Sequence, residues 1–141
     1  MANTVKLHVI TPSKLFYEGD IELVIVRTIT GEEGFMAHHS WVCKLLDAGE
    51  MCIQEAGTKE FKAAAVSGGF IDVKDEIVIY ADTAEWSFDI DVERADRIQH
   101  EVEKWLSEHK NEDTPELAEQ KSVLAKEKAR IKVAAGSVHK R

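Results

Sequence analysis

Few residues of this chain have the types and spacing that enzyme chemistry needs. Ser67-Gly68-Gly69 places a hydroxyl beside two glycines, as an oxyanion hole or a phosphate cradle would. The segment lacks the GxSxG pattern of a nucleophile elbow, and no helix-like run follows it to offer an N-terminus to a phosphate. It is typical instead of a tight β-turn or bulge. The sequence also contains no GxxxxGK[ST] loop for nucleotide phosphates.

Histidines and cysteines do not have the spacing of a metal site. His38 and His39 are adjacent, and adjacent residues on a strand point to opposite faces, so we expect a structural or interface role for His39. Cys43 and Cys52 lack CxxC or His-linked spacing. Both lie in strand-like runs, where a buried thiol acts as a small apolar side chain. We expect reduced cysteines in or near the core of a cytosolic protein.

The segment Ile90 to Ala95 lies where the composition of the chain changes. Asp91 is a good helix N-cap, and Arg94 three residues later can pair with it, which contributes about 0.2–0.5 kcal/mol. On residue type alone this segment needs no ligand. No Ser/His/Asp set or carboxylate pair stands out elsewhere, so the chain is predicted not to be an enzyme.

The spacing of apolar residues changes near residue 85, from the pattern of strands to the pattern of helices. Before it, short runs rich in Val, Ile and Phe are cut by Gly and Asp, beginning with the alternating run Val5 to Thr11. Strands of about five to eight residues with frequent turns predict an antiparallel sandwich or flattened barrel. Helix-length windows are absent from this part, which argues against a βαβ fold.

The run from Ile21 to Ile29 is expected to be covered on both faces. Strict alternation puts Ile21 and Ile25 on one face and Val24 and Val26 on the other. Gly31-Glu32-Glu33-Gly34 then reads as a turn, because its two glycines can take positive φ at low cost.

Helical spacing follows residue 85. Apolar residues recur every three or four positions from Val92 to Leu106, after N-cap residues at Asp89 to Asp91. A polar break spans His109 to Asp113. Thr114-Pro115 then offers a capping hydroxyl and a first-turn proline, and Gly136 is an expected stop. The expected apolar side of the second helix carries Leu117, Leu124, Ile131 and Ala135, beside Ala118, Ala125 and Ala129.

The two patterns predict a β + α fold. Residues 1–86 form an antiparallel β-sandwich, and residues 87–141 form an antiparallel two-helix hairpin. The apolar stripe of the hairpin consists mostly of small residues. Burying a Leu-sized side chain contributes about 1.5–3 kcal/mol and an alanine methyl much less, while ordering entropy opposes docking. We therefore expect docked and released states of similar free energy.

Composition restricts the partners. The chain has 141 residues, a formal net charge of −8 and a pI near 5.2, so we expect no nucleic-acid partner and no adsorption to an anionic membrane surface. No apolar run approaches the roughly 18 residues that span a bilayer, and the N-terminus lacks a signal-peptide pattern. We expect no direct membrane insertion, and membrane association only through another protein.

Several segments, in this order, resemble the epsilon subunit family of the F-type ATP synthase, and the resemblance covers the whole chain. They are Gly31-Glu32-Glu33-Gly34 followed by His39, Val66 to Val73, Ala81 to Glu85, and Asp89 to Asp91 leading to Arg94-Ala95. The resemblance implies a sandwich of about ten strands with a C-terminal helix hairpin. It also implies a non-catalytic rotor subunit that couples ion-driven rotation to ATP synthesis.

The resemblance further implies partners and a location. The sandwich would bind the gamma subunit and rest on the polar loops of the c-ring, with Glu32 and His39 as interface residues. The hairpin would extend along gamma to the alpha/beta catalytic head and inhibit ATP hydrolysis. The subunit would be peripheral, at the cytoplasmic face of the bacterial cell membrane. The family usually has Pro-Gly before this histidine and Pro two residues after it, where this chain has Ala37-His38 and Trp41.

A regulatory ATP is the one ligand that the resemblance suggests, and no cofactor is required. Its implied contacts are Glu85, Ile90, Asp91, Arg94, Ala95, Lys126 and Arg130. ATP-binding relatives carry two arginines where this chain has Lys126 and Arg130, and lysine keeps the charge but loses the bidentate fork. Glu101 stands at another basic position and would repel phosphate. The alternative functions are a free-standing adenine-nucleotide-sensing module and, with Ser67 and His39, a hydrolase.

Overall fold

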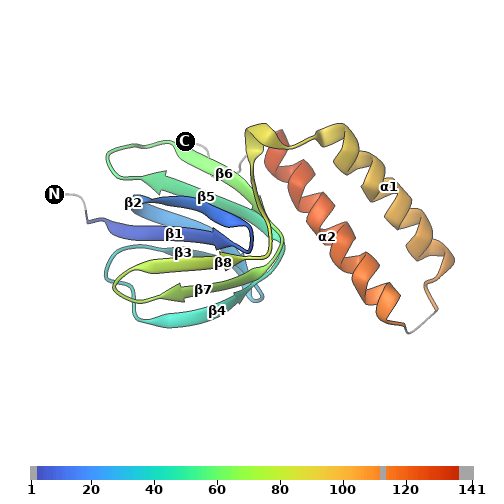
Figure 1. The fold of residues 1–141 in the computed structure, drawn as a ribbon, viewed down its shortest axis with the longest axis horizontal. Coiled ribbons are helices and arrows are strands. Elements are labelled where there is room, and N and C mark those ends of the chain that lie inside the picture. The colour runs from blue at the N-terminus through green and yellow to red at the C-terminus, as the bar shows by residue number, and fades with distance from the viewer. Residues whose placement is uncertain (1–2, 112–113, 137–141) are drawn as a thin grey trace.

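Nine strands followed by two long helices make up the part of the chain that the computed structural model describes, residues 3–111 and 114–136 (Figure 1). This confirms the β + α fold class; about ten strands were expected. The strands are β1 (Val5–Thr11), β2 (Lys14–Thr28), β3 (Gly31–Phe35), β4 (Val42–Leu46), β5 (Gly49–Glu55), β6 (Phe61–Val66), β7 (Gly69–Val73), β8 (Ile77–Ala81) and β9 (Ala84–Trp86). A short 3-10 turn, η1 (Ser87–Asp89), leads to α1 (Val92–Glu108) and α2 (Pro115–Ala135).

The strands form two layers joined through β2. One layer has the order β1-β8-β7-β4, and the other contains β2, β5, β6 and β9, with β3 paired to β2. The long β2 belongs to both layers, because its first half pairs with β1 and its second half pairs with β3 and β5. Neighbouring strands are antiparallel, except that β1 and β8 run parallel.

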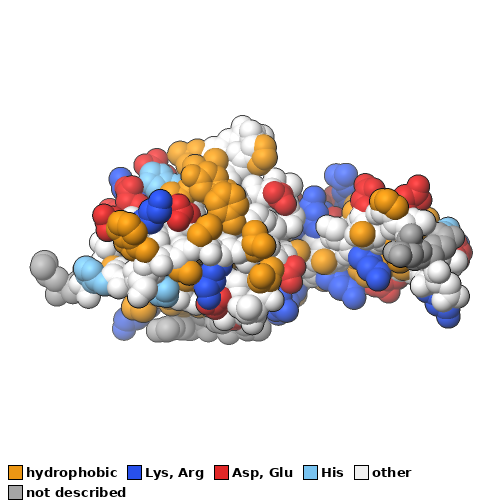
Figure 2. All heavy atoms as spheres, turned by 90° about the horizontal axis from the view of Figure 1, so that it is seen from below, with side chains coloured by type: hydrophobic (Ala, Val, Ile, Leu, Met, Phe, Trp, Pro, Cys, Tyr) orange, Lys and Arg blue, Asp and Glu red, His pale blue; other side chains and the backbone are white. Residues whose placement is uncertain are grey.

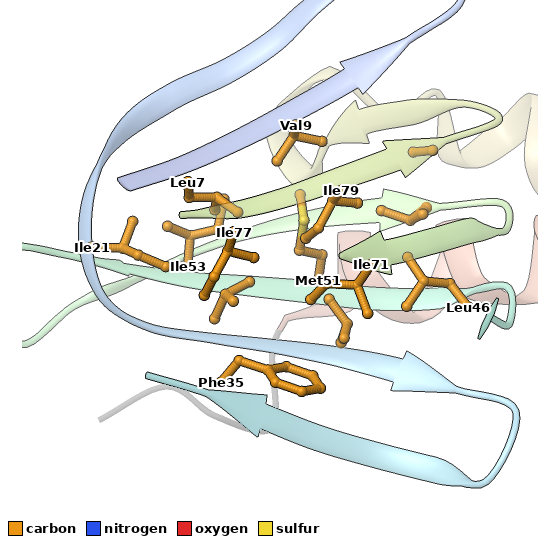
Figure 3. Close-up of a cluster of buried hydrophobic side chains, with 14 of the residues drawn as sticks. Leu7, Val9, Ile21, Phe35, Leu46, Met51, Ile53, Ile71, Ile77 and Ile79 are labelled. Carbon is orange, nitrogen blue, oxygen red and sulfur yellow. The ribbon is translucent and has the colours of Figure 1, made fainter. Parts of the chain in front are cut away.

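The main core fills the space between these layers (Figure 3). Its fully buried side chains include Leu7, Ile21, Phe35, Met51, Ile53, Ile71, Ile77 and Ile79. Within the described residues, every member of this sandwich core lies between Val5 and Trp86. The sandwich therefore has an apolar core that does not depend on the helices.

One prediction about β2 is wrong and another is confirmed. The register shifts between Ile21 and Leu23, so Ile21 lies on the same face as Val24 and Val26 and all three join the sandwich core. Such a bulge shifts the alternation of inward-facing and outward-facing side chains by one residue. A prediction from strict alternation cannot detect this shift. The expectation that both faces are covered holds, because Ile25 packs on the opposite side under α2.

Gly31-Glu32-Glu33-Gly34 is a strand and not the predicted turn. The chain reverses at Ile29-Thr30, and Gly31, with φ of +122°, begins β3. Glu33 accepts a hydrogen bond of 2.6 Å from the Thr28 hydroxyl and pairs with the Lys44 ammonium. Hydrogen bonds from Lys44 and Thr28 lower the pKa of Glu33. These contacts hold an acidic residue on the strand.

Cys43 is exposed and Cys52 is fully buried, so the expected core position is wrong for Cys43. Leu46 is the buried end of β4, and alternation from Leu46 turns Cys43 and Leu45 outward. Neither cysteine forms a disulfide within the described residues.

Ser67-Gly68-Gly69, predicted to be a tight β-turn or bulge, forms a bend between β6 and β7 that hydrogen-bonds to Asp82 and Thr83. Gly68 and Gly69 have φ of +131° and +121°. A Cβ on Gly69 would lie 1.9 Å from the carbonyl oxygen of Tyr80. Only glycine fits this backbone, which accounts for the motif without catalysis.

The helix ends follow the predicted caps. The Asp91 carboxylate accepts from the Arg94 backbone N–H at 3.1 Å, and the Thr114 hydroxyl accepts from that of Leu117 at 3.3 Å. The second helix ends at Ala135, before Gly136, as predicted. Part of the predicted break, residues 112–113, lies outside the described residues.

The predicted apolar side of α2 is partly wrong. Ala118, Ala125 and Ala135 are exposed, although Ala129 is buried as predicted. Glu127 and Val133 are also buried and were not predicted. The helix packs against α1 and also against β5 and β6, so its covered surface is wider than one stripe and includes a charged residue.

Candidate functional site

The hairpin meets the sandwich through α2, which contacts β5 and β6. The helix α1 packs on α2 (Figure 1). A second apolar cluster fills this junction, and we call it the docking cluster. Its members are Cys52, Ala63, Ala65, Ile90 and Val133, with Ile25, Phe61 and Ala134 at its edge. Val133 is 1% exposed and, among the described residues, is the only helix residue in the buried part of this cluster. Docking thus depends on little apolar area from the helices, in the part of the chain described.

An ion-pair group adjoins the docking cluster, and we call it the Arg130 bridge. The Arg130 Nε donates to Glu85 Oε1 at 2.8 Å and Nη2 donates to Glu85 Oε2 at 3.3 Å. The Arg130 Nη1 donates to both carboxylate oxygens of Glu127, at 3.2 and 2.9 Å. Because Glu85 belongs to β9 and the other two residues belong to α2, the bridge joins the hairpin to the sandwich.

Two of the three side chains in the Arg130 bridge are largely buried. The side chains of Arg130 and Glu127 are 12% and 5% exposed. Burial opposes the charged guanidinium, but the Glu85 hydrogen bond and the Glu127 charge outweigh it and raise the pKa of Arg130. A charge removed from such a group would leave its partner desolvated and uncompensated, which is costly.

A hollow of about 500 Å³ lies beside the bridge. It is lined by Lys14, Phe16, Thr83, Ala84, Glu85, Trp86, Asp89, Arg94, Ile98, Lys126, Glu127 and Arg130. Of the predicted ATP contacts, Glu85, Arg94, Lys126 and Arg130 therefore come together here. Basic side chains from α1 and α2 meet at one opening, although α1 and α2 are separate in sequence.

The other predicted ATP contacts do not line this hollow. Asp91 caps α1, Ile90 belongs to the docking cluster, and Ala95 is fully buried. Their positions have structural explanations. Glu101 is an exposed residue of α1 and is also absent from the lining.

Aromatic rings form one side of the hollow. The Phe16 and Trp86 rings stack with centroids 4.5 Å apart, and the Tyr17 ring meets Trp86 edge-on at 6.0 Å. Such rings offer a flat apolar surface to a planar ligand. Sequence reasoning missed Phe16, Trp86 and Glu127. Only Glu127 had a local signal, since it lies three residues before Arg130 on one helix.

The predicted interface residues Glu32 and His39 do not form one patch. Glu32 lies at the start of β3 and lines a hollow of about 180 Å³ with Lys128 and Lys132 of α2. His39 follows the other end of β3, where its ring lies 4.9 Å from that of Phe35. His38 and His39 lie in and beside a turn, with φ of +68° at His38, and not on the expected strand.

Apolar side chains also gather on the outer face of the first layer. Strand register places Ile10, Tyr80, Phe70 and Leu45 in one row across β1, β8, β7 and β4. The Phe70 and Tyr80 rings stack at 4.7 Å, and Leu45 is 59% exposed. Figure 2 shows hydrophobic side chains gathered on the sandwich, whereas charged side chains cover much of the hairpin. An apolar row of this kind is typical of a protein interface.

Residues 4–87 match the family described as ATP synthase, Delta/Epsilon chain, beta-sandwich domain. The chain belongs to the ATP synthase delta/epsilon family. It is 40% identical over 113 residues to the ATP synthase epsilon chain of Alkaliphilus oremlandii, covering 79% of this chain and 83% of that one. With the epsilon chain of Caldanaerobacter subterraneus it shares 35% identity over 136 residues, covering 95% and 96%.

Solved structures share the fold. A chain in the Euglena gracilis mitochondrial ATP synthase structure (OSCP/F1/c-ring) superposes with a TM-score of 0.79 at 20% identity, covering 96% of this chain and 82% of that one. A chain in the Tetrahymena thermophila ATP synthase central stalk/c-ring structure gives 0.59 at 17% identity, covering 92% and 96%.

Family membership makes the chain a non-catalytic, epsilon-type subunit of the ATP synthase. The recognition made from its motifs is therefore confirmed. In the part of the chain that the structure describes, neither helix combines the length and apolar character that crossing a bilayer requires.

Proposed function

We propose that this subunit couples ion-driven rotation to ATP synthesis and restrains ATP hydrolysis with its C-terminal hairpin. It would act at the cytoplasmic face of the bacterial membrane, as a peripheral part of the complex. The observation that supports the proposal is the division of its apolar clusters. The sandwich core contains no described helix residue, while the docking cluster takes one fully buried side chain, Val133, from α2.

The gamma subunit is the proposed partner of the outer apolar row. Ile10, Leu45, Phe70 and Tyr80 present apolar surface that a helical shaft could cover. Burying such surface contributes about 25 cal/mol for each Å² removed from water. The row lies on the layer away from α2, so gamma could stay bound while the hairpin moves.

Glu32 and His39 remain the proposed contacts with the polar loops of the c-ring. Each exposed ion pair at such a contact contributes about 0–1 kcal/mol, so the grip on the rotor must come mainly from gamma. Glu32 lies near the start of β3 and His39 follows its other end, so they would meet different parts of the ring or its surroundings.

The released hairpin would reach the alpha/beta catalytic head. Its second helix carries Lys121, Lys126, Lys128, Arg130 and Lys132. In the docked state Glu85 and Glu127 hold Arg130, and opening would release Arg130 from Glu85.

Removal of residues 88–141 tests the inhibitory role. The shortened chain retains the whole sandwich core, so we expect it to fold and to bind gamma. ATP hydrolysis by a complex reconstituted with it should exceed that of the complex with the full chain. Equal hydrolysis rates, with gamma binding intact, would contradict the inhibitory role.

A second candidate function is the sensing of adenine nucleotides by the same subunit. The hollow between hairpin and sandwich supports it, with Arg94 and Lys126 available for phosphates and the rings of Phe16 and Trp86 for a base. Calorimetric titration of the full chain with ATP tests this. Arg94→Ala should weaken binding, whereas Arg97→Ala, an exposed change on α1 outside the lining, should not. Equal affinities for the two variants would argue against this site.

A further inference from the structure

The Arg130 bridge leaves no guanidinium nitrogen without an acceptor. Nε, Nη1 and Nη2 all donate to carboxylate oxygens of Glu85 or Glu127. Bidentate carboxylate pairs use the same planar fork that arginine offers to a phosphate. One guanidinium and two carboxylates also carry a formal charge of −1 together, which disfavours an incoming anion.

We propose that Glu127 is an internal competitor for anions at Arg130. Its two carboxylate oxygens occupy Nη1, while Glu85 occupies Nε and Nη2, so a phosphate group that approaches Arg130 must displace Glu127 from Nη1. The buried position of Glu127, 5% exposed on a surface helix, agrees with such a role, because charged side chains are buried almost only when paired.

We assign the competing role to Glu127 and not to Glu85, because Glu127 lies on the same helix as Arg130. The two are three residues apart on α2 and move together, so Glu127 accompanies Arg130 whether the hairpin is docked or released. Glu85 stays with β9 of the sandwich. Glu127 thus lowers the anion affinity of Arg130 in both states, and Glu85 makes the bridge to the sandwich.

This inference rests on the proposed nucleotide site, and titration calorimetry of the full chain with inorganic tripolyphosphate and with ATP tests it. The test variant is Glu127→Gln, which removes one negative charge and keeps the size of the side chain. Glu119→Gln is the matched control, since it makes the same change on an exposed turn of α2 outside the hollow. Glu127→Ala is a second test variant, and circular dichroism verifies that each variant keeps its helices.

The expected result is that Glu127→Gln binds tripolyphosphate about ten-fold more tightly than Glu119→Gln, the scale of one charge-assisted hydrogen bond. Binding by Glu127→Gln and Glu127→Ala that is no tighter than that of Glu119→Gln, or undetectable in all three, would overturn the inference. Tighter tripolyphosphate binding without any ATP binding would support the role of Glu127 and remove ATP as the regulator. Wild-type ATP binding as tight as that of Glu127→Gln would leave the nucleotide site standing and refute the competition.

Discussion

Replacing Val133 with alanine removes apolar atoms from the buried side chain that α2 contributes to the docking cluster. Val133 is 1% exposed and packs in the docking cluster with Cys52, Ala63 and Ala65 of the sheet. Val133 does not belong to the sandwich core. The substitution should therefore loosen α2 from the sheet while the stability of the sandwich stays the same.

The size of the effect follows from the atoms removed. Valine to alanine deletes two methyl groups, and each buried carbon contributes about 0.8 kcal/mol. The free energy of opening the hairpin should therefore fall by about 1.6 kcal/mol, a factor of about 15 in the population of the open state. A residual cavity would add to this loss.

Native-state hydrogen exchange measures this change directly. Amides of α2 should exchange about 15-fold faster in Val133→Ala, whereas those of β7 and β8 should keep their wild-type rates. The control is Val92→Ala, which removes the same atoms from an exposed position on α1. Unchanged exchange of α2, or an equal acceleration in β7 and β8, would refute the idea that the hairpin opens as a separate unit.

Two further predictions concern the sandwich. Hydrogen bonds in the folded state lower the pKa of Glu33. The contribution of Glu33 to stability is therefore complete above the ordinary carboxyl pKa and is lost as the pH falls through the lowered pKa. In an NMR titration, Lys44→Met should shift the midpoint of Glu33 upward, and an unchanged midpoint would contradict the ion pair. Gly69→Ala should destabilise the sandwich by about 3 kcal/mol or more in urea unfolding, because the added Cβ meets the Tyr80 carbonyl oxygen at 1.9 Å and φ is +121°. Gly57→Ala, with positive φ but open space, should cost only about 1–2 kcal/mol, and equal losses would show that the close contact is unimportant.

Local signals were enough to predict that strands are followed by two helices, and where the helices end. Asp91, Thr114-Pro115 and Gly136 act through hydrogen bonds and φ preferences within a few residues, so their effect is visible in the sequence. The change of period near residue 85 likewise separates strands from helices, because the two periods differ.

Features that depend on pairing between distant residues could not be predicted in the same way. The shift at Ile21 and Leu23 follows from the register of β2 against β5, and the exposure of Cys43 follows from the inward position of Leu46. Gly31 to Gly34 reads as a turn locally, but the Glu33 contacts keep it on a strand.

The candidate site was only partly predictable for the same reason. The family resemblance implied its basic residues Arg94, Lys126 and Arg130, and they do come together. What these basic residues can bind depends on the carboxylates that pair with them, because Glu85 and Glu127 accept hydrogen bonds from Arg130 in the folded chain. A charge count along the helix cannot show that a nearby carboxylate is buried against the arginine.

Pulsed electron–electron spin resonance on the assembled complex tests most directly whether the hairpin leaves the sandwich. Spin labels at Glu60→Cys and Ser107→Cys, both exposed sites, report the separation of sandwich and hairpin, with Cys43→Ser to remove the exposed native thiol and buried Cys52 left in place. We expect two populations of distances, one of them as in the docked structure and one longer, with Val133→Ala increasing the longer one. A single docked distance in both proteins would contradict the account.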